Sequence, residues 1–204
     1  MKKTIALVRG DGIGPEIVDS AVTVLTRVAP YFKYVDVCAG GASIDKYGKP
    51  LSDCEFKKCA DADAILLGAV GGPKWDGLTG DMRPERALLD IRAGLGLYAN
   101  LRPTHLFTAL MSACPLRTDI AQKGIDILIV RELTGGIYFG EHGRRDDSAF
   151  DVMEYSMSEI SRIGRVAFNA ARARSGRLVS VDKANVLETS RLWRAVMHEL
   201  AHEY

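Results

Sequence analysis

Residues 125–140 read IDILIVRELTGGIYFG and indicate the fold class of the chain. Residues 127–130 are apolar without interruption, which predicts a strand buried on both faces, as in a parallel sheet. Polarity reverses at Arg131 and Glu132, and in open α/β sheets ligands bind beyond the carboxyl ends of the strands. Arg131 is therefore a candidate for gripping a carboxylate, and Tyr138, after a Gly-Gly turn, for donating a proton. The alternative is a surface ion pair of Arg131 with Glu132, a hairpin turn and a core tyrosine.

The composition is that of an ordinary globular protein. Its 204 residues allow one large domain or two small ones, and 47% apolar with 26% charged residues is typical of a soluble chain. A net charge of +1 gives no support for a nucleic-acid or membrane partner, and no stretch approaches transmembrane length. The first apolar run breaks at residues 9–11, too early for a signal peptide. The four cysteines lack CxxC spacing, which favours reduced thiols and a cytoplasmic location.

Apolar periodicity predicts strands alternating with helices, hence an α/β chain. The expected strands cover residues 4–8, 33–38, 64–67, 98–103 and 177–181. Two helices are expected to begin at Pro15 and at Pro84. Three more are expected over residues 53–60, 158–174 and 188–202, and a short helix or turn is expected between Gly41 and Gly48. In the helix after Pro15, an apolar stripe is expected to face the core: Ile17, Ala21, Val24, Leu25 and Val28.

Two glycine-rich turns follow predicted strands. Residues 10–16 (GDGIGPE) suggest a dinucleotide-binding turn, but the glycines run G-x-G-x-G-P rather than G-x-G-x-x-G, and proline removes one N–H that would face a phosphate. The pattern alone therefore disfavours a Rossmann fingerprint, although Asp36 lies at a suitable distance along the chain. The loop 68–77 stands where ligands bind in α/β proteins. Its alternative is a flexible connection, but long loops inside α/β units are more often functional.

Arginines are expected at several sheet edges. The helix that Pro84 opens places an acid, two leucines and an arginine on one face, at i, i+3, i+4 and i+7: Glu85, Leu88, Leu89 and Arg92. This face is either a core stripe with charged ends or a pocket wall for a molecule with an apolar branch and a carboxylate. Arg102 ends the strand 98–103. Together, Arg92, Arg102 and Arg131 suggest an acidic substrate with more than one carboxylate.

Two further motifs lie near the carboxyl terminus. Lys183 stands at the end of the strand 177–181, where desolvation would lower a lysine pKa and make it a base; otherwise it is a solvated lysine paired with Asp182. His198-Glu199-Leu200-Ala201-His202 matches the H-E-x-x-H motif of zinc peptidases. Only two residues follow His202, so no third ligand of that class follows, and we interpret the match as chance.

Five motifs resemble the isocitrate/isopropylmalate dehydrogenases, a family of β-decarboxylating dehydrogenases. They are GDGIGPE at residues 10–16, GGPKW at 71–75, YANLRP at 98–103, VRELTGGIYFG at 130–140 and VDKANVL at 181–187. The resemblance runs from Lys3 to the last helix. Leu88 and Leu89 beside Glu85 resemble the isopropylmalate branch, since isocitrate enzymes usually carry a serine and an asparagine on this helix. The implied fold is isopropylmalate dehydrogenase-like, a mostly parallel sheet flanked by helices, with the C-terminal portion missing.

The resemblance implies NAD-dependent oxidative decarboxylation of 3-isopropylmalate to 4-methyl-2-oxopentanoate, a step of leucine biosynthesis. The three arginines would bind the substrate carboxylates, and Leu88 and Leu89 its isopropyl group. Lys183 would help remove the 2-hydroxyl proton, and Tyr138 would protonate the enolate left by decarboxylation. A divalent metal, Mg²⁺ or Mn²⁺, would polarise the carbonyl group. The nicotinamide half of NAD would lie near these residues: Gly72, Pro73, Lys74, Trp75, Glu85 and Asn185.

Subunits of the family are longer, and their metal-binding aspartates lie beyond the end of this chain, so no metal ligand is expected in it. We expect a first domain over residues 1–98 and a second over 99–204, both incomplete, with the strands 4–8 and 64–67 lacking sheet neighbours. A homodimer is implied, interlocked through an arm at residues 134–155. The alternatives are a non-catalytic fragment of the same family that binds a ligand or a partner and, remotely, the zinc peptidase.

Overall fold

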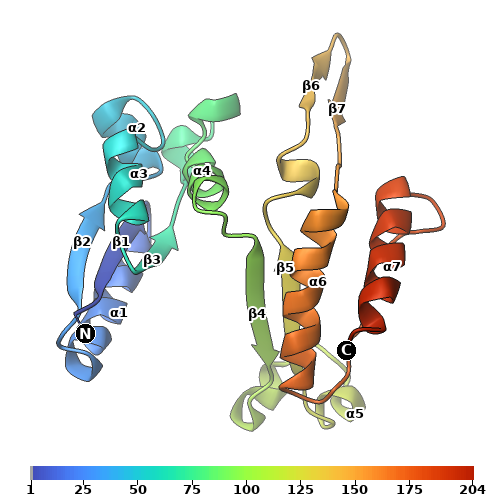
Figure 1. The fold of residues 1–204 in the computed structure, drawn as a ribbon. Coiled ribbons are helices and arrows are strands. Elements are labelled where there is room, and N and C mark those ends of the chain that lie inside the picture. The colour runs from blue at the N-terminus through green and yellow to red at the C-terminus, as the bar shows by residue number, and fades with distance from the viewer. Residues whose placement is uncertain (1) are drawn as a thin grey trace. The chain divides into compact units, whose positions relative to one another are not determined.

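The computed structural model describes residues 2–204, which form two compact units, one ending at Gly96 and one spanning Leu97–Tyr204. Figure 1 shows their strands and helices. Each unit has its own strands, helices and buried core, so the two are treated in turn. None of the helices in the described chain has the length and hydropathy that crossing a bilayer requires.

The first unit is built on a three-stranded parallel sheet in the order β2-β1-β3. The strands are β1 (Thr4–Gly10), β2 (Lys33–Val37) and β3 (Ala64–Ala69). The expectation that residues 4–8 lack sheet neighbours is wrong, because β1 is the central strand and Leu7 pairs with both Asp36 and Leu66. The same expectation for residues 64–67 is also wrong, because β3 pairs with β1. The outer edge of β3 is unpaired within the described part of the chain.

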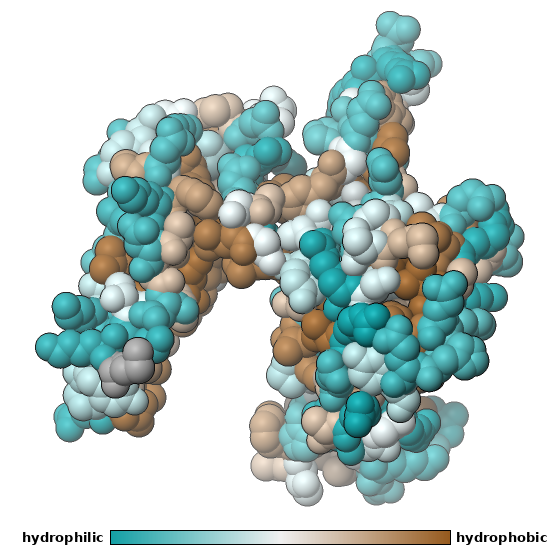
Figure 2. Space-filling model, viewed as in Figure 1, coloured by the Kyte–Doolittle hydropathy of each residue, from teal (hydrophilic) through white to brown (hydrophobic). Residues whose placement is uncertain are grey.

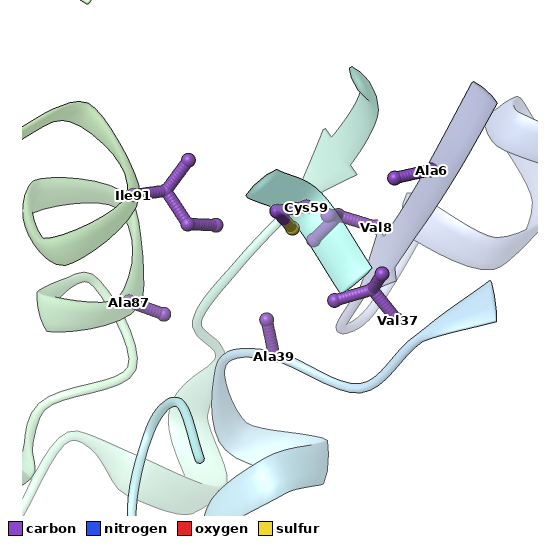
Figure 3. Packing of buried hydrophobic residues seen from close by; sticks show 7 residues of the cluster. All are labelled: Ala6, Val8, Val37, Ala39, Cys59, Ala87 and Ile91. Atoms are coloured by element: carbon purple, nitrogen blue, oxygen red, sulfur yellow. The ribbon is translucent and has the colours of Figure 1, made fainter. Parts of the chain in front are cut away.

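Helices pack on both faces of this sheet. They are α1 (Gly14–Val28), α2 (Gly41–Tyr47), α3 (Asp53–Ala60) and α4 (Arg86–Gly94), with short 3-10 turns η1 (Pro73–Trp75) and η2 (Gly80–Met82). Where α3 and α4 meet the sheet, a core of small and β-branched side chains forms, and Figure 3 shows it: Ala6, Val8, Val37, Ala39, Cys59, Ala87 and Ile91. The alternate residues of β1 point to the other face and pack against α1.

α1 buries a narrower face than its sequence predicts. Val18 is buried against Leu7, whereas the predicted core residues Ile17, Val24 and Val28 are exposed. Part of the apolar stripe therefore faces solvent, because no residue of the described chain covers that side of the helix. Figure 2 shows hydrophobic residues at the surface of both units.

The second unit contains a two-stranded antiparallel sheet, β4 (Ala99–His105) with β5 (Asp126–Glu132), and a separate hairpin, β6 (His142–Arg145) with β7 (Ser148–Asp151). Its helices are α5 (Thr118–Ala121), α6 (Met157–Arg172) and α7 (Glu188–Ala201), with 3-10 turns η3 (Thr108–Ala113) and η4 (Gly136–Tyr138). α6 begins with a capping box made by Ser156 and Glu159. It packs on α7 through a core that includes Ile160 and Leu200. In Figure 1 the hairpin extends past the amino end of α6.

Residues 127–130 form a strand as predicted, within β5, but the predicted surroundings of this strand are wrong, and so is the strand predicted at residues 177–181. Residues 127–130 do not lie buried in a parallel sheet, because β5 pairs with antiparallel β4 and Ile127 is 54% exposed. Residues 177–181 form no strand, and Val181 is 86% exposed. Both stretches have strand-forming composition. The described chain, however, supplies no partner for the second edge of β5 or for residues 177–181.

Gly14, the first residue of α1, lies against the carboxyl ends of β1 and β3. A Cβ atom there would overlap the Arg9 carbonyl oxygen and lie 2.9 Å from the Ala69 main chain, and backbone atoms cannot move aside cheaply. We expect Gly14→Ala to lower the free energy of unfolding of the first unit by about 1–3 kcal/mol. The better helix propensity of alanine offsets only part of this loss.

Urea unfolding followed by Trp75 emission, in a Trp193→Phe background, measures this effect in the first unit alone. Gly77→Ala is the matched control, since a Cβ atom at Gly77 meets no atom within 4 Å. The control should change the free energy of unfolding by less than about 0.5 kcal/mol. Equal losses in the two variants would contradict the steric argument.

Candidate active site

The predicted site residues fall into two sets, one in each unit. The first unit carries those of the glycine-rich loop and of α4: Gly72, Pro73, Lys74, Trp75, Glu85, Leu88, Leu89 and Arg92. The second unit carries those of the β4–β5 ladder, of η4 and of the turn before α7: Arg102, Arg131, Tyr138, Lys183 and Asn185. Each set is built by the strands and helices of its own unit.

The loop 68–77 is held against α2 by its side chains. Asp45 on α2 accepts hydrogen bonds from Lys74 Nζ at 2.6 Å and from Trp75 Nε1 at 3.3 Å. The hydrogen bond from Lys74 lowers the pKa of the Asp45 carboxyl below its ordinary value. The Trp75 ring covers Gly41, where a Cβ atom would overlap the indole. The loop therefore has fixed contacts, unlike a merely flexible connection.

The face of α4 that carries the predicted pocket residues is not the face that enters the core. Ala87 and Ile91 are the buried residues of α4. Leu88, Leu89 and Arg92, on the adjoining face, are half-buried. The interpretation of this face as a core stripe is therefore wrong, and its leucines and arginine remain accessible to a ligand.

Sequence analysis missed Asp11, which links the glycine-rich loop to the sheet. Asp11 is buried, and its carboxylate accepts a hydrogen bond from the Gly71 main-chain N–H at 2.9 Å. Gly71 in turn lies beside Glu85, because a Cβ atom at Gly71 would stand 2.9 Å from Glu85 Oε1. The available signal was an acid directly after a buried strand, but the N–H groups that donate to it lie 30 to 60 residues further along the chain.

Arg131 and Tyr138 lie next to each other in the second unit. The Arg131 Cζ atom is 5.5 Å from the centre of the Tyr138 ring, within cation–π range. In the β4–β5 ladder, Asn100 pairs with Arg131 and Arg102 pairs with Ile129, so both arginines project from one face. The structure thus brings two exposed guanidinium groups and a phenol from separate segments to one side of the unit. Two guanidinium groups on one face suit a ligand with two carboxylates.

Glu132 points to the opposite side of β5 from Arg131 and is buried. Its carboxylate accepts hydrogen bonds from the main-chain N–H groups of Thr134 and Gly135, at 2.9 and 2.7 Å. Arg162 on α6 donates to it at 2.8 Å. These bonds fix the turn that leads to η4. The alternative of a surface ion pair between Arg131 and Glu132 is wrong, because Glu132 is committed to α6.

Lys183 and Asn185 lie in the turn before α7 and are exposed. Asp182 stabilises this turn, since it accepts a main-chain N–H bond and a 2.7 Å hydrogen bond from Arg194. The bond from Arg194 holds the pKa of the Asp182 carboxyl below its ordinary value. The alternative pairing of Lys183 with Asp182 is therefore wrong. The desolvation that would make Lys183 a base is not found within residues 2–204 either, because residues 177–181 form no strand and the ammonium group is exposed.

Residues 2–204 contain no group of three or more histidine, cysteine, aspartate or glutamate side chains arranged to hold a metal ion. His198 is exposed on α7, and His202 lies beyond Ala201, the last residue of that helix. The donor set of the described chain therefore does not fit a Mg²⁺, Mn²⁺ or Zn²⁺ site.

A sequence model described as isocitrate/isopropylmalate dehydrogenase matches residues 4–204, and the chain belongs to this family. A 3-isopropylmalate dehydrogenase of Clostridium acetobutylicum is 54% identical over 98% of this chain and 58% of that protein. One from Rhodopirellula baltica is 55% identical over 100% of this chain and 59% of that protein. The chain thus spans less than two thirds of the length of these relatives.

Solved structures agree with the assigned fold. Isocitrate dehydrogenase from Methylococcus capsulatus superposes with a TM-score of 0.82 at 31% identity, covering 99% of this chain and 57% of that one. A β-decarboxylating dehydrogenase from Thermococcus kodakarensis, in its apo form, gives 0.73 at 32% identity, over 98% and 55%. The predicted isopropylmalate dehydrogenase-like α/β fold is confirmed, with β4 and β5 antiparallel. The family assignment overturns the zinc peptidase alternative.

The buried Glu132 carboxylate gives a test of how the site is held. We expect Glu132→Gln to lower the free energy of unfolding of the second unit by about 1–3 kcal/mol, because an amide donor then faces groups that need an acceptor. Urea unfolding followed by Trp193 emission, in a Trp75→Phe background, measures it. Glu203→Gln, which breaks an exposed ion pair, is the control and should leave the midpoint unchanged. Equal losses of stability in Glu132→Gln and Glu203→Gln would show that the buried hydrogen bonds of Glu132 do not stabilise the unit.

Proposed function

We propose that this chain carries the substrate-binding arginines and the proton-transferring residues of an NAD-dependent 3-isopropylmalate dehydrogenase. The reaction would convert 3-isopropylmalate to 4-methyl-2-oxopentanoate in leucine biosynthesis. The proposal depends chiefly on the adjacency of Arg131 and Tyr138, with Arg102 on the same face of the ladder. The names of relatives more than half identical to this chain support the same reaction.

The proposed substrate is a dicarboxylate with a branched apolar group, and the residues of both units suit its chemistry. Arg102 and Arg131 would each bind a carboxylate through charge-assisted hydrogen bonds. Arg92 in the first unit is proposed to bind the same substrate. Leu88 and Leu89, half-buried on α4 outside the core, would contact the isopropyl group.

Two residues of the second unit are proposed to move protons. Lys183 is exposed in this chain and is not paired with Asp182. It is proposed to accept the proton of the 2-hydroxyl group in the whole enzyme, where burial against the bound substrate would make it a base. NAD, when bound, supplies the acceptor for the hydride. After loss of carbon dioxide, the Tyr138 phenol would donate a proton to the enolate carbon, with Arg131 beside it stabilising negative charge.

The proposed cofactor residues are those of the glycine-rich loop, Glu85 and, in the second unit, Asn185. At Gly71 the backbone has a φ of +95° and a Cβ atom would press on Glu85, so the chain leaves bare main chain there. Glycine at this position lets the loop lie directly against Glu85, one of the proposed cofactor residues. A divalent metal, Mg²⁺ or Mn²⁺, is proposed only for the whole enzyme, because residues 2–204 offer no ligand set for it.

A homodimer in the cytoplasm is proposed as the working form, with two domains over residues 1–98 and 99–204. The proposed dimer arm, residues 134–155, contains the β6–β7 hairpin. Exposed apolar side chains at Ile137 and Val152 support a covering partner for this arm.

The second candidate function is a non-catalytic fragment of the same family that binds a ligand or a partner. A groove of ≈ 590 Å³ between β5 and residues 178–181 favours it, since Arg131 and Tyr138 border this groove beside apolar side chains. Such a fragment would bind substrate without oxidising it.

Calorimetric titration of 3-isopropylmalate without metal tests the binding step. We expect Arg131→Ala to weaken binding by about tenfold or more, because the variant loses a charge-assisted carboxylate contact. Arg117→Ala is the matched control, since Arg117 is an exposed arginine already paired with Asp119. Equal loss in the two variants, or binding that Arg131→Ala leaves intact, would refute the assigned role of Arg131.

Formation of NADH from NAD, 3-isopropylmalate and Mn²⁺ by the purified chain decides between the two candidates. Turnover that falls by about 10²-fold or more in Lys183→Met and in Tyr138→Phe supports the dehydrogenase assignment. Binding that depends on Arg131 but is never followed by NADH formation supports the non-catalytic fragment. If the chain neither binds 3-isopropylmalate nor forms NADH, both candidate functions are contradicted.

A further inference from the structure

Asp11 stands where all three strands of the first unit end. It directly follows β1, is 4% exposed, and donates its main-chain N–H to the Ala69 carbonyl at the end of β3, at 2.6 Å. Its carboxylate accepts three main-chain N–H bonds. Gly41 and Ala42, which follow β2, each donate at 2.7 Å, and Gly71, which follows β3, donates at 2.9 Å. One side chain thus ties together the segments that leave three parallel strands.

The surroundings are shaped to admit this carboxylate. Gly40 has a φ of +79°, and a Cβ atom there would lie 2.5 Å from Asp11 Oδ2. Only glycine therefore lets the turn after β2 approach the acid so closely. A buried carboxylate without donors would be costly, but here both oxygens accept hydrogen bonds.

The bond to Gly71 reaches the loop in which the proposed cofactor residues lie. Gly71 lies beside the Glu85 carboxylate, and the residues directly after Gly71 are Gly72 and the η1 turn. The only other side-chain hydrogen bonds of this stretch among residues 2–204 are those of Asp45 with Lys74 and Trp75. Asp45 is partly exposed, so Asp11 provides the buried anchor.

We propose that Asp11 is a positioning residue: it holds the main chain at Gly71 and thereby sets the place of Glu85 and of the η1 turn for the cofactor. The identity of that ligand depends on the proposed function, whereas the positioning does not. Asn cannot replace Asp11 in this task, because its side chain has one acceptor oxygen and would turn an N–H donor toward N–H groups.

Amide hydrogen exchange on Asp11→Asn tests the positioning directly. Asp63→Asn is the matched control, since Asp63 also accepts a main-chain N–H, that of Thr4 at 2.8 Å, at the opposite end of β1. We expect exchange at Gly71 to accelerate by about tenfold or more in Asp11→Asn and to stay unchanged in Asp63→Asn. Equal acceleration in both variants, or none in Asp11→Asn, would overturn the proposal.

Trp75 emission links the loop to the ligand. In a Trp193→Phe background, acrylamide quenching of Trp75 emission should rise by about twofold in Asp11→Asn. The dissociation constant of NADH, read from the same emission, should rise by about tenfold, while that of 3-isopropylmalate stays unchanged. An unchanged NADH constant in a variant with a loosened loop would refute the link to the cofactor.

The proposed function and this inference fail separately. If the unsubstituted chain binds no NADH, the cofactor assignment fails, while exchange at Gly71 still decides whether Asp11 holds the loop. If Asp11→Asn does not fold, the unsubstituted chain provides the test. Its Gly71 amide should then exchange about a hundredfold more slowly than that of Gly77, whose N–H has no acceptor among residues 2–204. Equal rates would overturn the proposal.

Discussion

A buried carboxylate that accepts main-chain N–H groups of a glycine turn organises each unit of this protein. In the first unit it is Asp11, which follows β1 and binds the turns after β2 and β3. In the second it is Glu132, the last residue of β5, which binds the turn toward η4 and receives Arg162. Turn amides have no ladder partner, so an internal acceptor is needed to bury them. Both acids stand at the end of a strand, where the proposed site residues also lie.

The close approach of turn main chain to buried side chains also explains the positions of several glycines. Gly40 and Gly71 adopt positive φ and approach Asp11 or Glu85 closely. Gly136 has a φ of +74° and comes up against the Tyr155 side chain. Burial raises the pKa of the Tyr155 hydroxyl, so this phenol is held neutral behind the turn. Rigid turns of this kind hold exposed side chains such as Tyr138 in place without burying them.

Local features of the structure were predictable from the sequence. The helix over residues 53–60 has its predicted bounds, because Ser52 precedes it in extended conformation and its acids occupy the first turn. The strand expected at 33–38 ends one residue earlier, at Val37. The family was also recognisable, because its motifs are long and contiguous. Helix ends, strand ends and contiguous motifs depend on residues that are neighbours in the chain, so they can be read from a single sequence.

Features that depend on distant partners were not predictable. Asp11 binds residues 30, 31 and 60 positions away, and no local pattern announces such a contact. The apolar run of β5 predicted burial on both faces, but burial needs a covering element, and the described chain covers one side only. The exposed stripe of α1 has the same origin. The composition of a segment shows which side chains are suited to burial, but they are buried only where another strand or helix covers them.

The open edge of β5 has a consequence for how molecules of this chain behave together. Its central residues, 127–130, are apolar and include neither proline nor lysine, the usual gatekeepers of an unpaired strand. Charges stand only at its ends, at Asp126, Arg131 and Glu132. An edge of this composition is a template for strand exchange between molecules, so self-association should grow with protein concentration. Replacing Ile129, which is 49% exposed, with a charged residue would oppose this self-association.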